Sequence, residues 1–271
     1  MKNKWSARSA AGALLELLYP SSIYCLACGN LIDDSRPYAL CDVCVREIGW
    51  ANGKTCAKCG KVLAESAESP LCSDCGGGVA AVSGGAPGGH IFDRGFSCAG
   101  YGEREKQIVH NFKYKDRAYY GAKLAEIMRD RIQGEDIGAD LLVPVPMFRK
   151  KERKRGFNQA AVMAESLSRK TGIECRKNLL VRTRDTAPMS KLGAEARRSN
   201  VEGAFAVAED MRIFVRERQV LLIDDVFTTG STADACADAL KKCGAESVCV
   251  LVFAAGADRT EANFGTGRVC G

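Results

Sequence analysis

The strongest chemical signal in this chain of 271 residues is a pair of carboxylates followed by a turn rich in hydroxyl groups. Asp224 and Asp225 come directly after an apolar run, residues 220–223. A turn that presents backbone N–H groups, hydroxyls and a helix N-terminus can bind an anion, and glycine within it permits positive φ and close backbone approach. We therefore predict a phosphate site, with the acids beside it on vicinal hydroxyls or a magnesium ion. The residues of this turn are Thr228, Thr229, Gly230, Ser231 and Thr232.

The alternative is that these residues only form an edge turn or cap a helix. Capping accounts for Ser231 or Thr232, but it does not require two acids, two further threonines and a glycine in fixed order. The spacing resembles the phosphoribosyl-pyrophosphate (PRPP) motif of type I phosphoribosyltransferases, in which an apolar strand, two acids and a Thr-Thr-Gly-x-Thr turn hold ribose 5-phosphate. The resemblance implies binding of PRPP with Mg²⁺.

A second polar cluster follows another apolar run, residues 141–145. Two prolines end this run, because proline offers no N–H to a sheet. A basic loop is expected at the exit, over residues 149–155, and it leads to Arg155, Asn158 and Gln159. These three residues would open the next helix and direct donors at pyrophosphate. The alternatives are a patch that faces nucleic acid and a solvated loop.

A third segment, residues 182–205, is polar and broken by proline and glycine. Loops of this length in compact domains are commonly lids. We predict that Arg197, Arg198 and Asn200 close over departing pyrophosphate and exclude water. Periodicity alone equally permits a solvated helical turn.

Eight of the 14 cysteines form four Cys-x-x-Cys pairs, and their spacing shows a 31-residue unit used twice. Two thiolates on a tight turn can both face one tetrahedral Zn²⁺. Glycine follows three of the pairs, at Gly29, Gly60 and Gly76, where the turn can use positive φ. The sequence therefore predicts two structural zinc ions with sequential pairing, one held by Cys25, Cys28, Cys41 and Cys44 and the other by Cys56, Cys59, Cys72 and Cys75.

Crossed pairing between the two units is geometrically open. A disulfide framework and a thioredoxin-like redox pair are further alternatives, but the identical doubled spacing and the lack of an expected secretory signal disfavour both. Each zinc ion with four thiolates carries −2, so two centres would lower the formal net charge of +6 by four. Overall charge is then weak evidence for nucleic-acid binding.

The rest of the chain alternates strand and helix patterns, which implies a parallel sheet. Strands are expected at 92–101, 141–145, 221–225 and 248–253, and helices at 103–112, 119–132, 160–170 and 233–243. We expect an α/β fold, namely a type I phosphoribosyltransferase-like parallel sheet flanked by helices, with a small N-terminal zinc-ribbon module. The expected parts are an N-terminal amphipathic helix at 1–22, a double zinc ribbon at 23–78, a Gly-rich linker at 79–90 and a phosphoribosyltransferase-like domain at 91–271. No run approaches the roughly 20 apolar residues of a membrane span, and a cytoplasmic location is expected.

The order of motifs along the whole chain resembles the ComF family, the competence-protein F group of bacterial phosphoribosyltransferase-like proteins. These motifs are the doubled Cys-x-x-Cys module and residues 112–114, 143–146, 155–159, 182–186, 197–201 and 223–232. The resemblance implies a type I phosphoribosyltransferase fold with an N-terminal zinc module, a cytoplasmic location and, for some members, uptake of transforming DNA beside a helicase-like ATPase. One departure is Met189, where the family often has glutamine.

The leading hypothesis is a Mg²⁺-dependent protein that binds PRPP and transfers its phosphoribosyl group to an acceptor that the sequence does not identify. Asp224, Asp225 and Arg155 would serve catalysis together with residues 197–200. The alternative is a non-enzymatic PRPP-binding or DNA-uptake factor that acts through its zinc module and a helicase-like partner. A zinc-ribbon protein that binds single-stranded DNA is a second alternative.

Overall fold

The computed structural model describes residues 23–33, 35–76, 89–114, 117–185, 201 and 203–258. The helix predicted at 1–22 and most of the predicted linker lie outside the described residues, and so do Met189, Arg197, Arg198 and Asn200. Within the described ranges, no helix is both long and apolar enough to cross a membrane.

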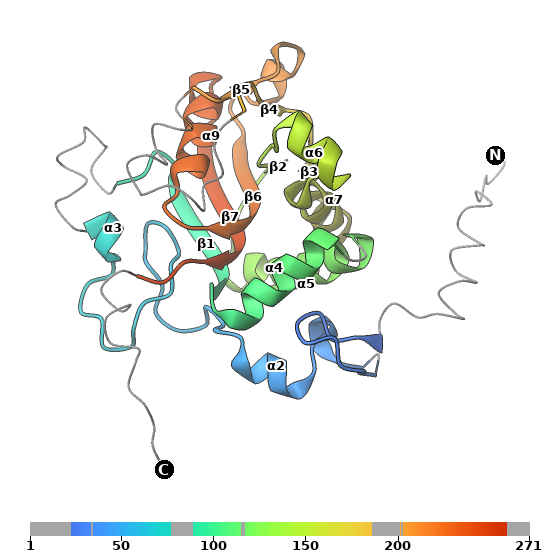
Figure 1. Ribbon diagram of the computed structural model, residues 1–271. Coiled ribbons are helices and arrows are strands. Elements are labelled where there is room, and N and C mark those ends of the chain that lie inside the picture. The colour runs from blue at the N-terminus through green and yellow to red at the C-terminus, as the bar shows by residue number, and fades with distance from the viewer. Residues whose placement is uncertain are drawn as a thin grey trace, which may run out of the picture.

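A parallel sheet of five strands forms the centre of the molecule, as predicted (Figure 1). Its spatial order is β1-β7-β6-β2-β3. The two longest strands, β6 and β7, lie side by side in the middle, and their buried runs, residues 220–223 and 250–255, are apolar, which suits a sheet that is covered on both faces. The strands are β1 (Arg94–Gly100), β2 (Leu141–Pro144), β3 (Glu174–Cys175), β6 (Gln219–Phe227) and β7 (Ser247–Ala255).

The two faces of the sheet carry separate hydrophobic cores. Along β6, Leu221 and Ile223 belong to one core, whereas Val220 and Leu222 belong to the other, as the period of two in a strand requires. The first core is shared with helices α4, α5 and α7, and the second with helix α9, so the helices lie on opposite faces (Figure 1). These helices are α4 (Glu103–Tyr114), α5 (Arg117–Gly134), α7 (Gln159–Thr171) and α9 (Ser231–Lys242).

The basic segment after β2 differs from the expected loop, because it forms a short helix, α6 (Arg149–Arg155). The helix ends at Gly156, which adopts the left-handed conformation with φ of 87°. Two short strands that the sequence patterns did not predict, β4 (Leu180–Arg182) and β5 (Phe205–Val207), form an antiparallel pair on the α9 side. A 3-10 helix, η5 (Glu209–Phe214), follows them.

The cysteine-rich module packs along the free edge of β1. Trp50 forms an antiparallel bridge with Ala99, and the N–H of Gly95 donates to the carbonyl of Lys58 at 2.8 Å. Gly60 and Gly95 lie so close that a Cβ on Gly60 would stand 2.5 Å from the carbonyl oxygen of Gly95. The module thus covers a strand edge that would otherwise be open to pairing. Its helical segments are η2 (Pro37–Ala39), α2 (Asp42–Glu47) and α3 (Ser73–Gly76).

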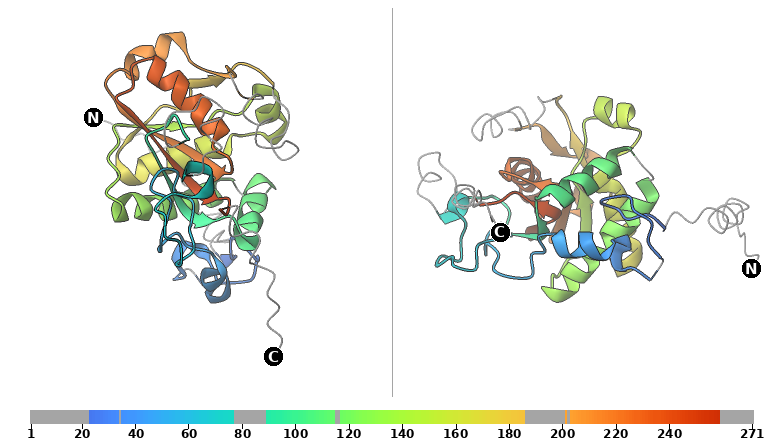
Figure 2. Two further views of the ribbon diagram at one scale, coloured as in Figure 1. Left: turned by 90° about the vertical axis from the view of Figure 1, so that its left-hand side faces the viewer. Right: turned by 60° about the horizontal axis from the view of Figure 1, so that its bottom comes forward.

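The two halves of the module join different cores. Residues 25–48 pack with α4 and α5, where the Asn111 side-chain amide and the Tyr120 hydroxyl both donate to the carbonyl of Leu26. Residues 56–75 pack with the core on the α9 side. In Figure 2, the blue first half lies beside the green helices, whereas the cyan second half lies away from them.

Candidate metal centres and PRPP pocket

Two groups of four cysteines have the geometry of tetrahedral metal sites. Within each group, all four sulfur atoms lie within 4.8 Å of one another. The distance between Cys28 Sγ and Cys41 Sγ is 3.8 Å, and that between Cys59 Sγ and Cys72 Sγ is 3.6 Å. A tetrahedral Zn²⁺ with Zn–S bonds of about 2.3 Å requires sulfur separations near 3.8 Å, whereas a disulfide requires about 2.05 Å. The cysteines therefore fit zinc and not disulfides.

The pairing is sequential, as predicted, with Cys25, Cys28, Cys41 and Cys44 in one site and Cys56, Cys59, Cys72 and Cys75 in the other. Four thiolates leave no open position for a reacting group, so both centres are structural.

The duplication of the module extends to its hydrogen bonds. The N–H of Cys41 donates to the sulfur of Cys25 at 3.4 Å, and the N–H of Cys72 donates to the sulfur of Cys56 at 3.3 Å. In both halves the glycine after the first Cys-x-x-Cys pair has positive φ, with 75° at Gly29 and 73° at Gly60. Gly76 differs from the expected turn, because it is the last residue of helix α3. The two knuckles are therefore alike, and the two second halves are helical.

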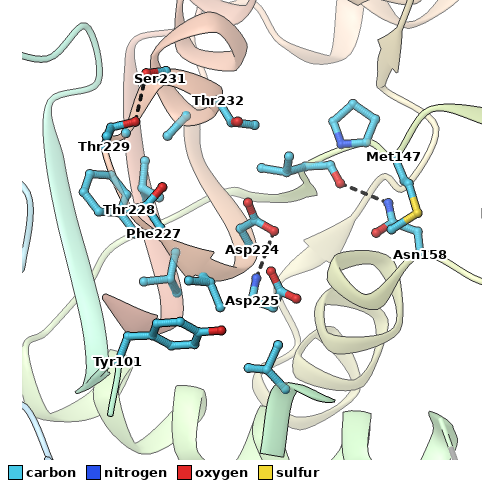
Figure 3. Close-up of a pocket in the computed structure, with 18 of the residues that line it drawn as sticks. Tyr101, Met147, Asn158, Asp224, Asp225, Phe227, Thr228, Thr229, Ser231 and Thr232 are labelled. Carbon is cyan, nitrogen blue, oxygen red and sulfur yellow. Dashed lines mark hydrogen bonds between the residues drawn. The ribbon is translucent and has the colours of Figure 1, made fainter. Parts of the chain in front are cut away.

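A pocket of about 350 Å³ opens at the carboxyl ends of β2 and β6 (Figure 3). Pro144 pairs with Ile223 across these strands, so the chain that leaves β2 passes beside Asp224. The connection from β2 leads outward to β3, whereas the connection from β6 leads the other way to β7. Ligands bind open parallel sheets at this kind of switch point.

The two predicted acids lie together in this pocket. Burial of the Asp224 carboxyl group raises its pKa well above the usual range, the charge of Asp225 raises it further, and Arg182 partly opposes the rise. The N–H of Asp225 donates to Asp224 Oδ1 at 2.9 Å. Two adjacent acids whose charges repel each other fit a divalent cation or the hydroxyl groups of a sugar.

The hydroxyl-rich turn lines the same pocket, from Thr228 to Thr232. Gly230 has φ of 76° and precedes the first residue of α9. The hydroxyls of Thr229 and Ser231 lie 3.0 Å apart and form a hydrogen bond. Hydroxyls, backbone N–H groups and the N-terminus of a 12-residue helix thus converge on one side of the pocket, which is the arrangement that holds a phosphate.

Residues predicted at the pyrophosphate side divide between two places. Asn158 lines the pocket, but its amide donates to the carbonyl of Val145 at 3.0 Å and its Oδ1 accepts from Ala160 N–H at 3.1 Å as the cap of α7. Arg155 and Gln159 do not line the pocket. Instead, the guanidinium of Arg155 donates to the side chain of buried Gln159. Within the described residues, the Nε2 of Gln159 has no hydrogen-bond partner.

Three further polar residues line the pocket and were absent from the predicted site: Tyr101, Lys113 and Arg182. Burial lowers the pKa of Arg182, and nearby anionic groups, Asp224 among them, partly offset this effect. Burial also raises the pKa of Tyr101, with a further contribution from Asp225. Lys113 and Arg182 belong to motifs that carry the ComF resemblance. The sequence therefore marked both residues, but their spacing alone did not indicate what they do.

Residues 122–265 match the family described as "Phosphoribosyl transferase domain". This chain belongs to that family. Residues 14–76 match a second family, "Double zinc ribbon domain". Both matches agree with the predicted fold class, a phosphoribosyltransferase-like parallel sheet with an N-terminal zinc-ribbon module.

The resemblance to the ComF group is confirmed by named bacterial relatives. "Competence protein F" of Haemophilus influenzae is 31% identical over 146 residues, which are 52% of this chain and 63% of that protein. The chain therefore matches less than two thirds of the length of that relative. "DNA utilization protein YhgH" of Escherichia coli strain K12 is 27% identical over 221 residues, which are 77% of this chain and 93% of that protein.

Among solved structures, a glutamine PRPP amidotransferase from B. subtilis aligns with 49% of this chain and 26% of its own, at 18% identity and a TM-score of 0.34. TT1426 from Thermus thermophilus aligns with 55% of this chain and 80% of its own, at 16% identity and a TM-score of 0.31.

Proposed function

We propose that this chain binds PRPP together with Mg²⁺ and transfers the phosphoribosyl group to an acceptor, with release of pyrophosphate. The observation that carries the proposal is the meeting of two acids and a phosphate-type turn in one pocket at the switch point of the sheet. The 5-phosphate would lie on the N–H groups and hydroxyls of residues 228–232. Asp224 and Asp225 would accept hydrogen bonds from the ribose hydroxyls and hold the cation that accompanies the diphosphate.

In the proposed reaction, the bond between C1 of the ribose and the pyrophosphate oxygen breaks, and pyrophosphate leaves with the electron pair. A lone pair of the acceptor forms the new bond to C1. The two carboxylates would favour positive charge as it develops on the ribose, and Lys113 and Arg182 would offset the charge of the departing pyrophosphate. The role of Arg155, Gln159 and the 197–200 segment at the pyrophosphate stays a prediction, and for Arg155 and Gln159 it requires movement into the pocket, which neither of them lines.

Calorimetric titration of the zinc-loaded protein with PRPP and Mg²⁺ tests the binding half of the proposal. Replacement of both acids, Asp224→Asn with Asp225→Asn, should abolish the binding heat, because it removes the charge that holds the cation and weakens the hydroxyl acceptors. Asp238→Asn is the matched control, since Asp238 lies on the helix that follows the phosphate turn but pairs with Lys242 outside the pocket. An absence of heat with wild-type protein at millimolar PRPP would refute the proposal.

The alternative, a non-enzymatic PRPP-binding or DNA-uptake factor, is favoured by one feature of the pocket. Among the described residues that line it, Asp224 and Asp225 are the only side chains suited to accept a proton near neutral pH, and both are committed to ribose and cation. The names of the relatives, which refer to competence and DNA utilization, support the same alternative. Pyrophosphate release from PRPP in the presence of a panel of bases and amines separates the two functions: turnover supports the transferase, and binding without turnover supports the alternative.

The cytoplasmic location, the helicase-like partner and the contact with single-stranded DNA stay predictions. For DNA, fluorescence anisotropy with the full chain should show affinity that falls steeply with salt. Lys150→Glu with Lys154→Glu reverses two exposed charges on α6 and leaves the zinc module intact. Lost affinity would assign the contact to α6, and retained affinity would exclude these two charges from it.

A further inference from the structure

His90 is the last residue of the segment predicted as a Gly-rich linker, yet it is buried, with only 7% of its surface exposed. Its imidazole ring stacks on Phe92 at a centroid distance of 4.6 Å. The same ring meets Phe227 at 5.6 Å with the planes 70° apart. Phe227 is the last residue of β6 and directly precedes the phosphate turn. The ring of His90 therefore lies between the start of the sheet domain and the turn.

Hydrogen bonds join this histidine to the first turn of α9. The distance between His90 Nδ1 and Asp234 Oδ2 is 2.9 Å, and the N–H of Ile91 donates to Asp234 Oδ1 at 2.7 Å. Asp234 is held in turn by its own N–H, which donates to the carbonyl of Gly230 at 2.8 Å. Asp234 thus links the two parts, because its carboxylate bonds to residues 90–91 and its backbone N–H bonds to the glycine of the phosphate turn.

The imidazole also lies directly against Gly230. A Cβ on this glycine would stand 2.9 Å from His90 Nδ1 and still closer to His90 Cε1. His90 does not line the pocket, so it packs against the turn without facing the ligand site. A phosphate site depends on donors that are fixed before the ligand arrives. In enzymes, a displacement of about 1 Å can lower the reaction rate by about two orders of magnitude.

We propose that His90 is a positioning residue for the phosphate turn: through Nδ1 and Asp234 it fixes the first turn of α9, and through its ring it fixes Gly230. The inference rests on the proposed function, because it assigns His90 to the 5-phosphate side of the PRPP site. It also gives the segment before β1 a role in ligand affinity that its composition does not suggest.

Two amide substitutions separate the hydrogen bond from the packing. In His90→Asn the amide nitrogen occupies the place of Nδ1 and can still donate to Asp234, whereas in His90→Gln it moves toward the place of Nε2. Glutamine is closer to histidine in volume, so if packing alone matters, His90→Gln should keep the higher ligand affinity. If His90 acts through Nδ1, His90→Asn should keep the higher ligand affinity instead. His110→Asn is the matched control, because His110 is the other histidine of the chain and lies exposed on α4.

Calorimetry with three ligands and Mg²⁺ provides the readout: PRPP, ribose 5-phosphate and pyrophosphate. We expect His90→Gln to weaken ribose 5-phosphate and PRPP about tenfold, which corresponds to about 1.4 kcal/mol, and to leave pyrophosphate affinity unchanged. His90→Asn should retain more affinity, and His110→Asn should behave as wild type.

Two results would overturn the inference alone: unchanged ribose 5-phosphate affinity in His90→Gln, or an equal loss for all three ligands together with a lower melting temperature. Failure of the wild-type protein to bind either PRPP or ribose 5-phosphate would overturn the proposed function, and the inference with it.

Discussion

Replacement of Gly230 by alanine should lower the free energy of unfolding more than any other replacement of a glycine by alanine at a helix end, for two separable reasons. A non-glycine residue at a φ of 76° costs about 1–2 kcal/mol in the left-handed region. The added Cβ would also meet Phe227 Cζ at 2.8 Å and the ring of His90, and overpacking of this kind typically costs about 1–3 kcal/mol. The expected loss in free energy of unfolding is therefore about 2–5 kcal/mol.

Gly156→Ala provides the matched control. Gly156 has a similar φ of 87°, but a Cβ there would meet nothing within 4 Å. Only the conformational cost should remain, so urea unfolding should place Gly156→Ala about 1–2 kcal/mol below wild type. Calorimetry should show weaker PRPP binding in Gly230→Ala, because the turn must shift to accommodate the methyl group. Equal destabilisation of the two variants would refute the steric argument and with it the close packing of His90 on the turn.

Three further outcomes are expected. Asp224→Asn should stabilise the protein at neutral pH while it weakens PRPP binding. The amide cannot ionise, so it avoids the free-energy cost of burying a carboxylate, and this cost is what raises the pKa of Asp224. A carboxyl group with a raised pKa in the folded state favours folding most at low pH, so the advantage of this variant in urea unfolding should shrink from about pH 8 toward about pH 5. Cys28→Ser should lose one of two zinc equivalents on metal analysis and expose residues up to 75 to protease, and full retention of zinc would contradict the sequential site. Asn158→Ala should cost about 1–2 kcal/mol in free energy of unfolding, because it removes the cap of α7 and the hydrogen bond to Val145, and a loss of PRPP affinity at unchanged stability would show that the amide serves the ligand instead.

The sequence by itself determined the features that depend on short stretches of chain. The spacing of the cysteines determined both four-sulfur sites, because two residues on one tight turn cannot point far apart and a repeated interval repeats the geometry. The order of acids, threonines and glycine after an apolar run determined the pocket wall from Asp224 to Thr232, since a strand, a turn and a helix start follow each other within a few residues. The alternation of strand and helix patterns determined a parallel sheet.

Only the tertiary structure decided which distant residues meet these elements. His90 and Asp234 are 144 residues apart, and the contact exists because the segment before β1 packs along α9, with His90 at Asp234 and Asp93 at Lys241. Lys113 and Arg182 reach the pocket from α4 and β4, and the amide of Asn158 is occupied by backbone partners that spacing does not reveal. The physical reason is the same in each case: local geometry follows from covalent spacing, whereas contacts across the sheet follow from strand order and packing, which a linear pattern leaves open.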